Sequence, residues 1–203
     1  QTIGNVNVHV NFYEYKLYSK NLHKSIRSFT NKVIRCQKTP YILPDCEDRT
    51  REYTFTIDGS DTRDYDDAIG YRNVNGSDVV SVYISNVPHY MDFYDLWSEY
   101  TSRVATIYLP DKKRPLIPYS LGEGVLSLIE KETRCVFYMD AVVKDGLVDS
   151  VSFGVCTIQV AKNHVYDSNE LHEDIQYQTI FGIIQTMMPH HPYQKYVNDS
   201  SEV

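Results

Sequence analysis

Five aspartates lie within ten residues in the stretch DGSDTRDYDD, which runs from Asp58 to Asp67 and contains a single arginine. Carboxylates this close to one another repel and raise each other's pKa. Such a cluster persists either because it lies in water or because a cation sits among its oxygens. Clustered carboxylate oxygens are hard ligands of the kind that Mg²⁺ and Mn²⁺ prefer.

Two alternatives to a magnesium site can be weighed from the residues. An EF-hand loop requires Gly at its sixth position and Glu at its twelfth. Counting from Asp58 places Arg63 and Ile69 there, and the frame that starts at Asp61 fails as well, so an EF-hand is excluded. A solvated acidic loop stays open, because carboxylates usually lie in solvent. Apolar strands expected on both sides of the loop argue against it, since a half-buried carboxylate needs a cation.

Strand and helix patterns surround this loop. The run EYTFTID before the aspartates is rich in aromatic and β-branched residues and predicts a strand. Asn75-Gly76 and Asp145-Gly146 are turn signals between apolar runs, and each predicts a β-hairpin. The remaining patterns predict a strand over residues 5–13, helices over residues 22–33, 92–105 and 168–188, and an extended segment over residues 106–118.

The strands are grouped rather than alternating with helices, which is typical of an α+β fold. Charge divides the chain unevenly, because residues 1–38 hold seven Lys and Arg against the single acid Glu14, while the net charge of the whole is −7. We therefore distinguish a basic N-terminal segment and linker, residues 1–50, from a second region, residues 51–203. An acidic body does not attract nucleic acid by its overall field, so such a partner requires a local basic strip or a bound metal.

The sequence also argues against several classes of protein. No run approaches the roughly 18 apolar residues of a membrane span, and no secretory signal is visible at the start. The four cysteines are widely spaced without a C-x-x-C pair, which gives a zinc site little support and favours reduced thiols. We expect no membrane partner and an intracellular, cytoplasmic location.

The aspartate loop and the motifs that follow it resemble the ribonuclease II and ribonuclease R family, which shares its catalytic RNB domain with the eukaryotic exosome nuclease. Residues 56–68 read TIDGSDTRDYDDA and are similar to the family signature T-I-D-x5-D-x-D-D-A. The resemblance covers residues 53–188. It continues in the family's order through YISNVPHY at 83–90, Glu99 and Arg103, YLPD at 108–111, Ile117-Pro118, LSL at 126–128, and Arg134.

The resemblance implies a mixed, mostly antiparallel sheet flanked by helices and an exoribonuclease that removes nucleotides from the 3′ end of single-stranded RNA, releasing nucleoside 5′-monophosphates. It implies Mg²⁺ as cofactor, with Mn²⁺ as a substitute. Asp61 lies outside the signature. The implied catalytic and metal-binding residues are Asp58, Asp64, Asp66 and Asp67. The expected RNA-binding residues are Tyr108, which stacks on a base, and the cations Lys112, Lys113 and Arg114, for which a solvated loop is the alternative.

Two departures from the family pattern bear on activity. Asn86 stands where the family has an aspartate, and the family's downstream motif resembling S-P-I-R-R-Y, with its catalytic arginine, does not occur before Val203. The chain therefore resembles the N-terminal part of an incomplete RNB-like catalytic core. We expect the remainder of the catalytic domain as a partner, in the same or another chain. The alternative is a catalytically inactive fragment that serves as a structural or protein-binding module.

Overall fold

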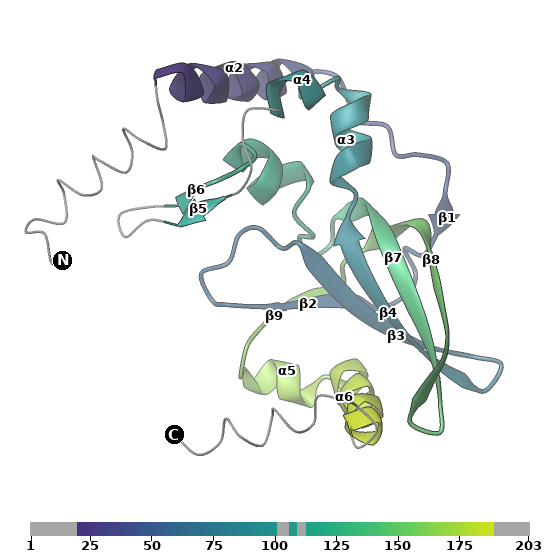
Figure 1. Ribbon diagram of the computed structural model, residues 1–203. Coiled ribbons are helices and arrows are strands. Elements are labelled where there is room, and N and C mark those ends of the chain that lie inside the picture. Colours follow the sequence, from purple (N-terminus) through teal and green to yellow (C-terminus); the bar gives the residue numbers. More distant parts are fainter. Residues whose placement is uncertain (1–19, 101–105, 109–112, 189–203) are drawn as a thin grey trace, which may run out of the picture. The chain divides into compact units, whose positions relative to one another are not determined.

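The computed structural model describes residues 20–100, 106–108 and 113–188 (Figure 1). The predicted strand over residues 5–13 lies outside this part of the chain. Two compact units are present, and the division at residue 50 stays a prediction. The helical unit comprises Gln1–Ile42 and Val87–Leu126, and the sheet unit comprises Leu43–Asn86 and Ser127–Val203.

The sheet unit is built on one seven-stranded sheet with the order β1-β8-β7-β4-β3-β2-β9. Parallel pairing occurs where β1 joins β8 and where β9 joins β2, and the other neighbours are antiparallel. This confirms the mixed, mostly antiparallel sheet of an α+β fold. The strands are β1 (Glu47–Asp48), β2 (Thr54–Asp58), β3 (Asp67–Val74), β4 (Ser77–Ser85), β7 (Thr133–Lys144), β8 (Leu147–Gln159) and β9 (Lys162–Val165).

Both predicted hairpins are confirmed. Asn75 and Gly76, between β3 and β4, have φ angles of 52° and 84°, and Asp145 and Gly146, between β7 and β8, have φ angles of 50° and 72°. Positive φ at both central residues is the requirement of a type I′ turn, whose twist matches that of the strands. Asn and Asp tolerate this conformation better than other residues with a side chain.

The two faces of the sheet are covered differently. On one face, Phe55 of β2 packs with Leu171 and Ile180 of the C-terminal helices. On the other face, Tyr83 and Val136 belong to a separate apolar cluster. Phe55 and Val136 are fully buried, so each face contributes its own core.

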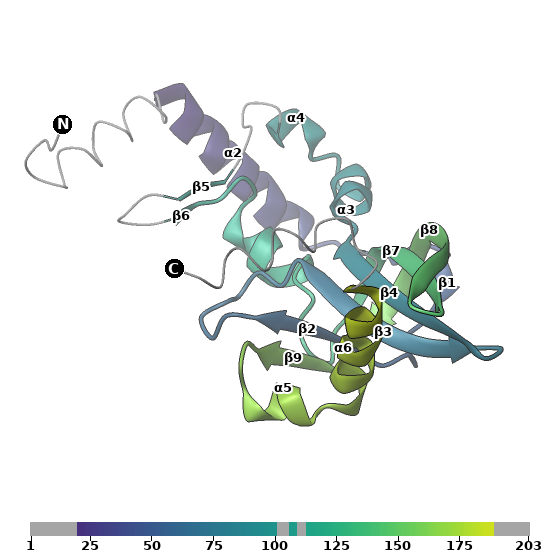
Figure 2. The same cartoon turned by 60° about the horizontal axis from the view of Figure 1, so that its bottom comes forward.

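The predicted helix over residues 168–188 is wrong in one respect, because it is two helices, α5 (Asn169–Glu173) and α6 (Ile175–Met187). The predicted cap is present, since the Ser168 side chain accepts a hydrogen bond from the Leu171 amide. The break falls at Asp174, which has extended backbone angles and caps α6 by accepting from the Tyr177 amide. A capping residue is non-helical by nature, so Asp174 ends one helix and starts the next. Figure 2 shows α6 in front of β3, which it contacts.

The helical unit has an apolar and aromatic core that includes Phe29, Val33, Met91, Leu96 and Leu121. Phe29 and Val33 confirm the predicted apolar face of the first helix. None of the helices within the described residues is long and apolar enough to cross a membrane. The elements are α2 (Lys20–Cys36), α3 (Val87–Phe93), α4 (Trp97–Tyr100), β5 (Ile107–Tyr108), β6 (Lys113–Arg114) and a short π-helical turn, η1 (Leu121–Val125).

The predicted helix over residues 92–105 is also wrong as a single element. The chain forms α3 and α4 with a turn between them, and residues 101–105 lie outside the described part. Asp95 in this turn has a φ of 49°, and the Leu96 amide donates to the carbonyl oxygen of Met91. This arrangement is a helix C-terminal motif, which periodicity alone does not reveal.

Candidate active site

The four signature aspartates lie on one connection within the sheet unit. Asp58 is the last residue of β2, and Asp67 is the first residue of β3, its antiparallel neighbour. Asp64 and Asp66 lie in the loop between these strands, which we call the aspartate loop, residues 59–66. Asp58 and Asp64 are half-buried, whereas Asp66 and Asp67 are exposed. Antiparallel pairing of β2 with β3 brings the two ends of the loop together.

Asp58 has an unusual electrostatic environment. Loss of solvent raises its pKa, a hydrogen bond with the Thr56 side chain opposes this, and the negative charges of Asp67 and Asp64 raise the pKa further. The carboxylate of Asp58 is therefore ionised at a cost that a nearby cation would remove.

A short segment from another part of the sequence holds the aspartate loop in place. The Tyr65 amide donates to the hydroxyl of Ser127 at 3.0 Å, and this hydroxyl donates to the carbonyl oxygen of Arg63, also at 3.0 Å. The Leu128 amide donates to the carbonyl oxygen of Tyr65 at 2.9 Å. Ser127 and Leu128 are fully buried, so these bonds fix the backbone on both sides of Asp64.

Two further side chains fix Ser127 and Leu128. The Nε of Arg134 donates to the carbonyl oxygen of Ser127 at 2.9 Å. The amide group of Asn163 on β9 donates to the Leu128 carbonyl oxygen and to the Thr56 hydroxyl, each at 2.9 Å. Sequence analysis identified Ser127 and Arg134 only as parts of motifs and missed Asn163. No local signal marks Asn163, because its partners are 35 and 107 residues away.

The strand β4 also ends at this loop. The Ser85 amide donates to the carbonyl oxygen of Asp66 at 3.2 Å. The next residue, Asn86, is buried, and its side-chain amide donates to the Sγ of Cys135 at 3.4 Å. An aspartate at position 86 could not donate this bond when ionised. The departure from the family pattern therefore has a partner in this chain, the thiol of Cys135.

The donors of the aspartate loop suit a hard divalent cation in type, because all are carboxylate oxygens. Within the described residues, however, no group of three or more His, Cys, Asp or Glu side chains is arranged to hold one ion. The structure thus brings the signature aspartates to one loop and the two strand ends that flank it, where the charges of Asp64 and Asp67 act on Asp58. Their assignment as metal ligands stays a prediction.

The predicted RNA-binding residues belong to the helical unit. Tyr108 on β5 pairs with Lys113 on β6, and Arg114 pairs with Ile107, so backbone register brings three of the four together. Lys112 lies outside the described residues. The signature aspartates belong to the sheet unit.

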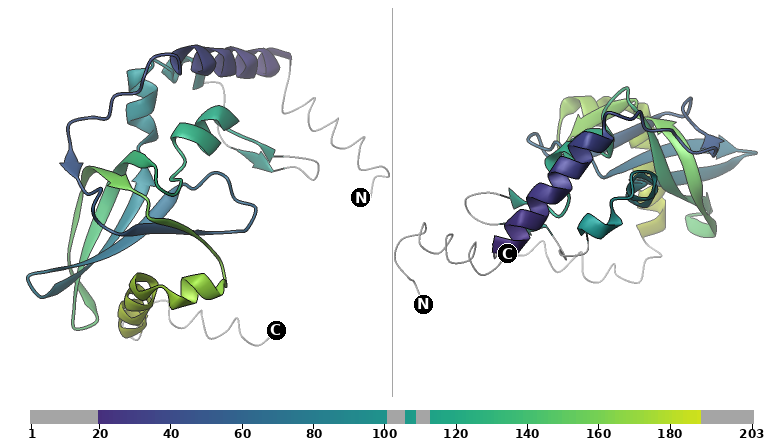
Figure 3. Two further views of the ribbon diagram at one scale, coloured as in Figure 1. Left: turned by 180° about the vertical axis from the view of Figure 1, so that it is seen from behind. Right: turned by 90° about the horizontal axis from the view of Figure 1, so that it is seen from above.

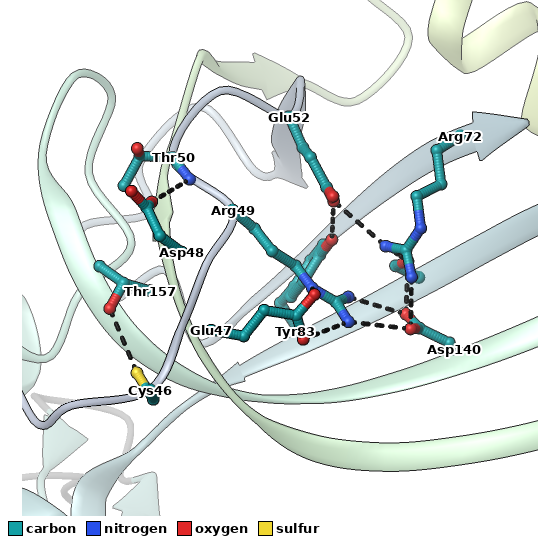
Figure 4. Close-up of polar contacts among 11 residues, drawn as sticks. Cys46, Glu47, Asp48, Arg49, Thr50, Glu52, Arg72, Tyr83, Asp140 and Thr157 are labelled. Atoms are coloured by element: carbon teal, nitrogen blue, oxygen red, sulfur yellow. Dashed lines mark hydrogen bonds and ion pairs between the residues drawn. The ribbon is translucent and has the colours of Figure 1, made fainter. Parts of the chain in front are cut away.

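A second cluster of charges surrounds the buried Asp140 on β7 (Figure 4). The guanidinium of Arg49 binds Asp140 at 3.0 Å and lies 3.7 Å from the ring centroid of Tyr138. Arg72 also binds Asp140, and it reaches Glu52 at 3.1 Å. Burial alone raises the pKa of Asp140, but hydrogen bonds from Arg49 and Ser81 hold it below its usual value. These acids are already neutralised by arginines, so this cluster is structural and offers no metal site.

Comparison with known proteins identifies the family. The RNB domain matches residues 46–176, more than half of the chain, and the chain belongs to the RNB-domain family. Ribonuclease R of Thermotoga maritima is 33% identical over 123 residues, which are 59% of this chain and 17% of that protein. The chain spans less than a fifth of the length of the first curated relatives that it matches.

Solved structures support the same fold. Mycoplasma genitalium RNase R, in complex with ribose-methylated single-stranded RNA, has a TM-score of 0.62 and 20% identity, covering 76% of this chain and 27% of that one. Yeast Ssd1, a pseudonuclease, has a TM-score of 0.56 and 17% identity, covering 71% and 20% of the respective chains. At these identities the likeness shows the fold alone, and the fold occurs in both a nuclease and a pseudonuclease.

Proposed function

We propose that this chain supplies the acidic part of a metal-dependent exoribonuclease that degrades single-stranded RNA from the 3′ end and releases nucleoside 5′-monophosphates. One observation carries the proposal. The RNB-domain match over residues 46–176 encloses the aspartate loop and all four signature acids. The names ribonuclease R and exoribonuclease 2 among the relatives support the reaction class.

The proposed metal ligands are Asp58, Asp64, Asp66 and Asp67, directly or through water, with Mg²⁺ as the ion and Mn²⁺ as a substitute. When bound, divalent cations lower the pKa of a bound water and stabilise the negative charge that develops on the phosphate. The raised pKa of Asp58 supports a cation nearby, because its charge would then be compensated. Ser127 acts as a positioning residue, since it holds the backbone next to Asp64.

The proposed RNA contacts come from the hairpin of β5 and β6. Tyr108 would stack on a base near the 3′ end, which requires no particular sequence because every base has a π-face. Lys112, Lys113 and Arg114 would bind the RNA backbone. The register pairing of Tyr108 with Lys113 supports a shared site, because it puts an aromatic and a cationic residue at one position of the hairpin.

The proposal includes a partner, namely the remainder of an RNB catalytic domain, in the same or another chain. The family resemblance assigns a catalytic arginine to that remainder, and the chain spans only 17% of the Thermotoga maritima relative. The activity of these residues on their own is therefore expected to be lower than that of a complete domain.

The decisive experiment compares two aspartates of the same loop. Asp66→Asn removes a signature acid, and Asp61→Asn is the matched control, because Asp61 is an exposed loop acid outside the signature. Titration calorimetry with Mg²⁺ and Mn²⁺ should show binding to the wild type and the control, and binding weakened at least about tenfold in Asp66→Asn. Degradation of 5′-labelled RNA should follow the same order. Equal metal binding by all three proteins would contradict the ligand assignment.

A catalytically inactive RNB-derived module with a structural or protein-binding role is the second candidate. Two observations favour it. No group of three acidic, His or Cys side chains within the described residues is arranged around one ion, and a pseudonuclease shares the fold. The calorimetric titration separates the candidates. If the chain is an inactive module, the wild type and Asp66→Asn should bind Mg²⁺ equally weakly.

A further inference from the structure

An apolar row crosses one face of the sheet from β2 to β8, and helices cover only part of it. Cross-strand pairing joins five residues into one row, in which each side chain lies next to its partner on the same face. At one end of this row Phe55 is fully buried, whereas at the other end Phe153 is 74% exposed. The row runs from Phe55 through Ile69, Val82 and Met139 to Phe153.

The change in exposure along this row follows the helices. Phe55 packs against Leu171 of α5 and Ile180 of α6, and Ile69 packs against the same cluster. The cluster reaches β4 at Val80, but the members of the row beyond Ile69, which are Val82, Met139 and Phe153, do not belong to it. An antiparallel sheet with a solvated face normally alternates apolar and polar residues, so an apolar outer face indicates a surface that is to be buried.

We call the uncovered part the open sheet face. It consists of Ile84 on β4, Phe137 and Met139 on β7, and Val151 and Phe153 on β8. Ile84 pairs with Phe137, and these two side chains are 55% and 40% exposed. Val151 is 45% exposed. All five residues are apolar, and the patch ends at the aspartate loop, because Ile84 pairs on its other side with Asp67.

The helix α6 also exposes apolar side chains, on the side that faces away from the sheet core. Its residue Ile180 is buried, yet Phe181 and Ile184 are 48% and 46% exposed, and Met188, directly after the helix, is 40% exposed. The apolar side of α6 is therefore wider than its buried part, and exposed apolar surface that adjoins a core is typical of a site of contact with another element. The outer side of α6 and the open sheet face therefore both require a neighbour.

The edge strand β8 adds a third observation. It runs from Leu147 to Gln159, but its outer neighbour β1 pairs only with Cys156 and Thr157. Within the described residues, no strand pairs with the outer edge of β8 from Leu147 to Val155, where the hairpin extends past β1 (Figure 3). A long, apolar edge strand is a template for further protein contacts.

We infer that the open sheet face and the outer side of α6 together bind a further polypeptide segment of an RNB domain, which continues the layer of α5 and α6 across β4, β7 and β8. This inference rests on the proposed function, in which the remainder of the domain is the partner. Two observations identify the occupant. Most of each relative lies outside the matched part, since this chain spans 27% of the Mycoplasma genitalium chain. The face to be covered is also continuous with one that helices of the same domain already cover.

The test uses Phe153→Asp on this chain. Because Phe153 is largely exposed, the variant is expected to fold like the wild type. Leu147→Asp is the matched control: Leu147 lies on the same strand and is 54% exposed. It pairs with Lys144, five residues from Met139 on β7, and the register shift of β8 beside Val142 and Val143 places it on the opposite face. Circular dichroism and the unfolding midpoint establish that both variants fold.

The probe is the C-terminal part of Thermotoga maritima ribonuclease R beyond the stretch matched here, co-expressed with each version of this chain. Complex formation is measured by light scattering, and the amide exchange of β8 is followed by mass spectrometry. The expected result is a complex with the wild type and with Leu147→Asp, with slower exchange over Leu147–Val155. Phe153→Asp should weaken the complex at least about tenfold.

Three outcomes would overturn the inference. These are the absence of a complex, a complex that Phe153→Asp leaves unchanged, and self-association of the wild type that Phe153→Asp abolishes, which would identify a second copy as the occupant. The assay reads assembly rather than cleavage. A complex that forms as expected but leaves RNA intact would count against the proposed function alone, whereas RNA degradation that is indifferent to Phe153→Asp would count against the inference alone.

Discussion

The two units of the chain carry opposite charges. The helical unit holds eleven Lys and Arg against six Asp and Glu, whereas the sheet unit holds nine against twenty-one. RNA is a polyanion, so the basic unit can attract it directly, and the acidic unit can approach it only with bound cations. The contrast agrees with the proposed function, in which RNA-backbone contacts belong to one unit and metal ligands to the other.

The acidic unit itself contains two kinds of acid. Asp140 is buried and neutralised by Arg49 and Arg72, so its charge contributes to the fold. Asp58 is half-buried and lies near other acids, so its charge opposes the fold. The surroundings of each acid therefore distinguish acids that stabilise the fold from acids that destabilise it.

The largest effect is expected at Asp140. Replacement by Ala leaves two arginines without their shared partner, one of them almost fully buried, and should lower the free energy of unfolding by about 3–5 kcal/mol. Urea denaturation measures this change. Asp149→Ala is the control, because the pair of Lys144 and Asp149 is exposed and should contribute less than about 1 kcal/mol. Similar losses in the two variants would remove the distinction between buried and surface acids.

Ser127→Ala should have the next largest effect. It removes the acceptor of the Tyr65 amide and the donor to the Arg63 carbonyl oxygen, and a buried amide left without a partner costs about 1–3 kcal/mol. We expect Mg²⁺ affinity to fall about tenfold, because groups that support metal ligands typically have effects of this size. Calorimetry measures the affinity. Ser60 is exposed in the same loop, so Ser60→Ala should leave both the stability and the Mg²⁺ affinity unchanged. Equal effects of the two substitutions would contradict the positioning role of Ser127.

Contacts between residues that are close in the sequence were predictable, whereas contacts between distant residues were not. Local signals were sufficient for the hairpins, since Asn75-Gly76 and Asp145-Gly146 set their own backbone angles. They were also sufficient for the aspartate loop, because its acids are neighbours in the chain. Ser127 is 62 residues from Tyr65, and this distance hides its contact from any local pattern.

The two wrong helix predictions have a common cause. Apolar periodicity continues through Asp95 and Asp174, but both residues leave helical geometry. Asp174 does so while its carboxylate binds His164 at 3.1 Å and accepts a hydrogen bond from Tyr53. These partners come from β9 and from the residue before β2, so only the folded chain explains the break. The arrangement of charges around Asp140 was invisible in the sequence for the same reason.

A smaller effect of opposite sign is expected at Asp58. Its pKa in the folded state is raised above the ordinary value of 3.8, so the ionised form destabilises the fold at pH 7, and stability is regained as the pH falls through the raised value. Asp58→Asn should therefore increase the free energy of unfolding at pH 7 without metal, by less than about 1 kcal/mol because solvent screens the site.

Asp140 is expected to affect stability in the opposite direction to Asp58. The pKa of Asp140 is lowered, so its contribution is present above pH 3.8 and is lost as the pH falls further. Urea denaturation of the wild type and Asp58→Asn, with and without Mg²⁺, should show the variant more stable without metal and less responsive to it. A variant that is less stable under both conditions would place Asp58 among the acids that support the fold.

The smallest effect tests the basic unit. Lys113→Gln and Arg114→Gln each remove one charge from β6, and each should reduce the dependence of RNA affinity on salt, with the slope of log affinity against log salt falling by about 0.7 for single-stranded RNA. Fluorescence anisotropy with a labelled oligonucleotide measures the slope. Lys131→Gln, an exposed cation of the acidic unit, is the control and should leave the slope unchanged. If all three variants changed the slope equally, RNA would respond to the net charge of the chain, and the separation of tasks between the units would be lost.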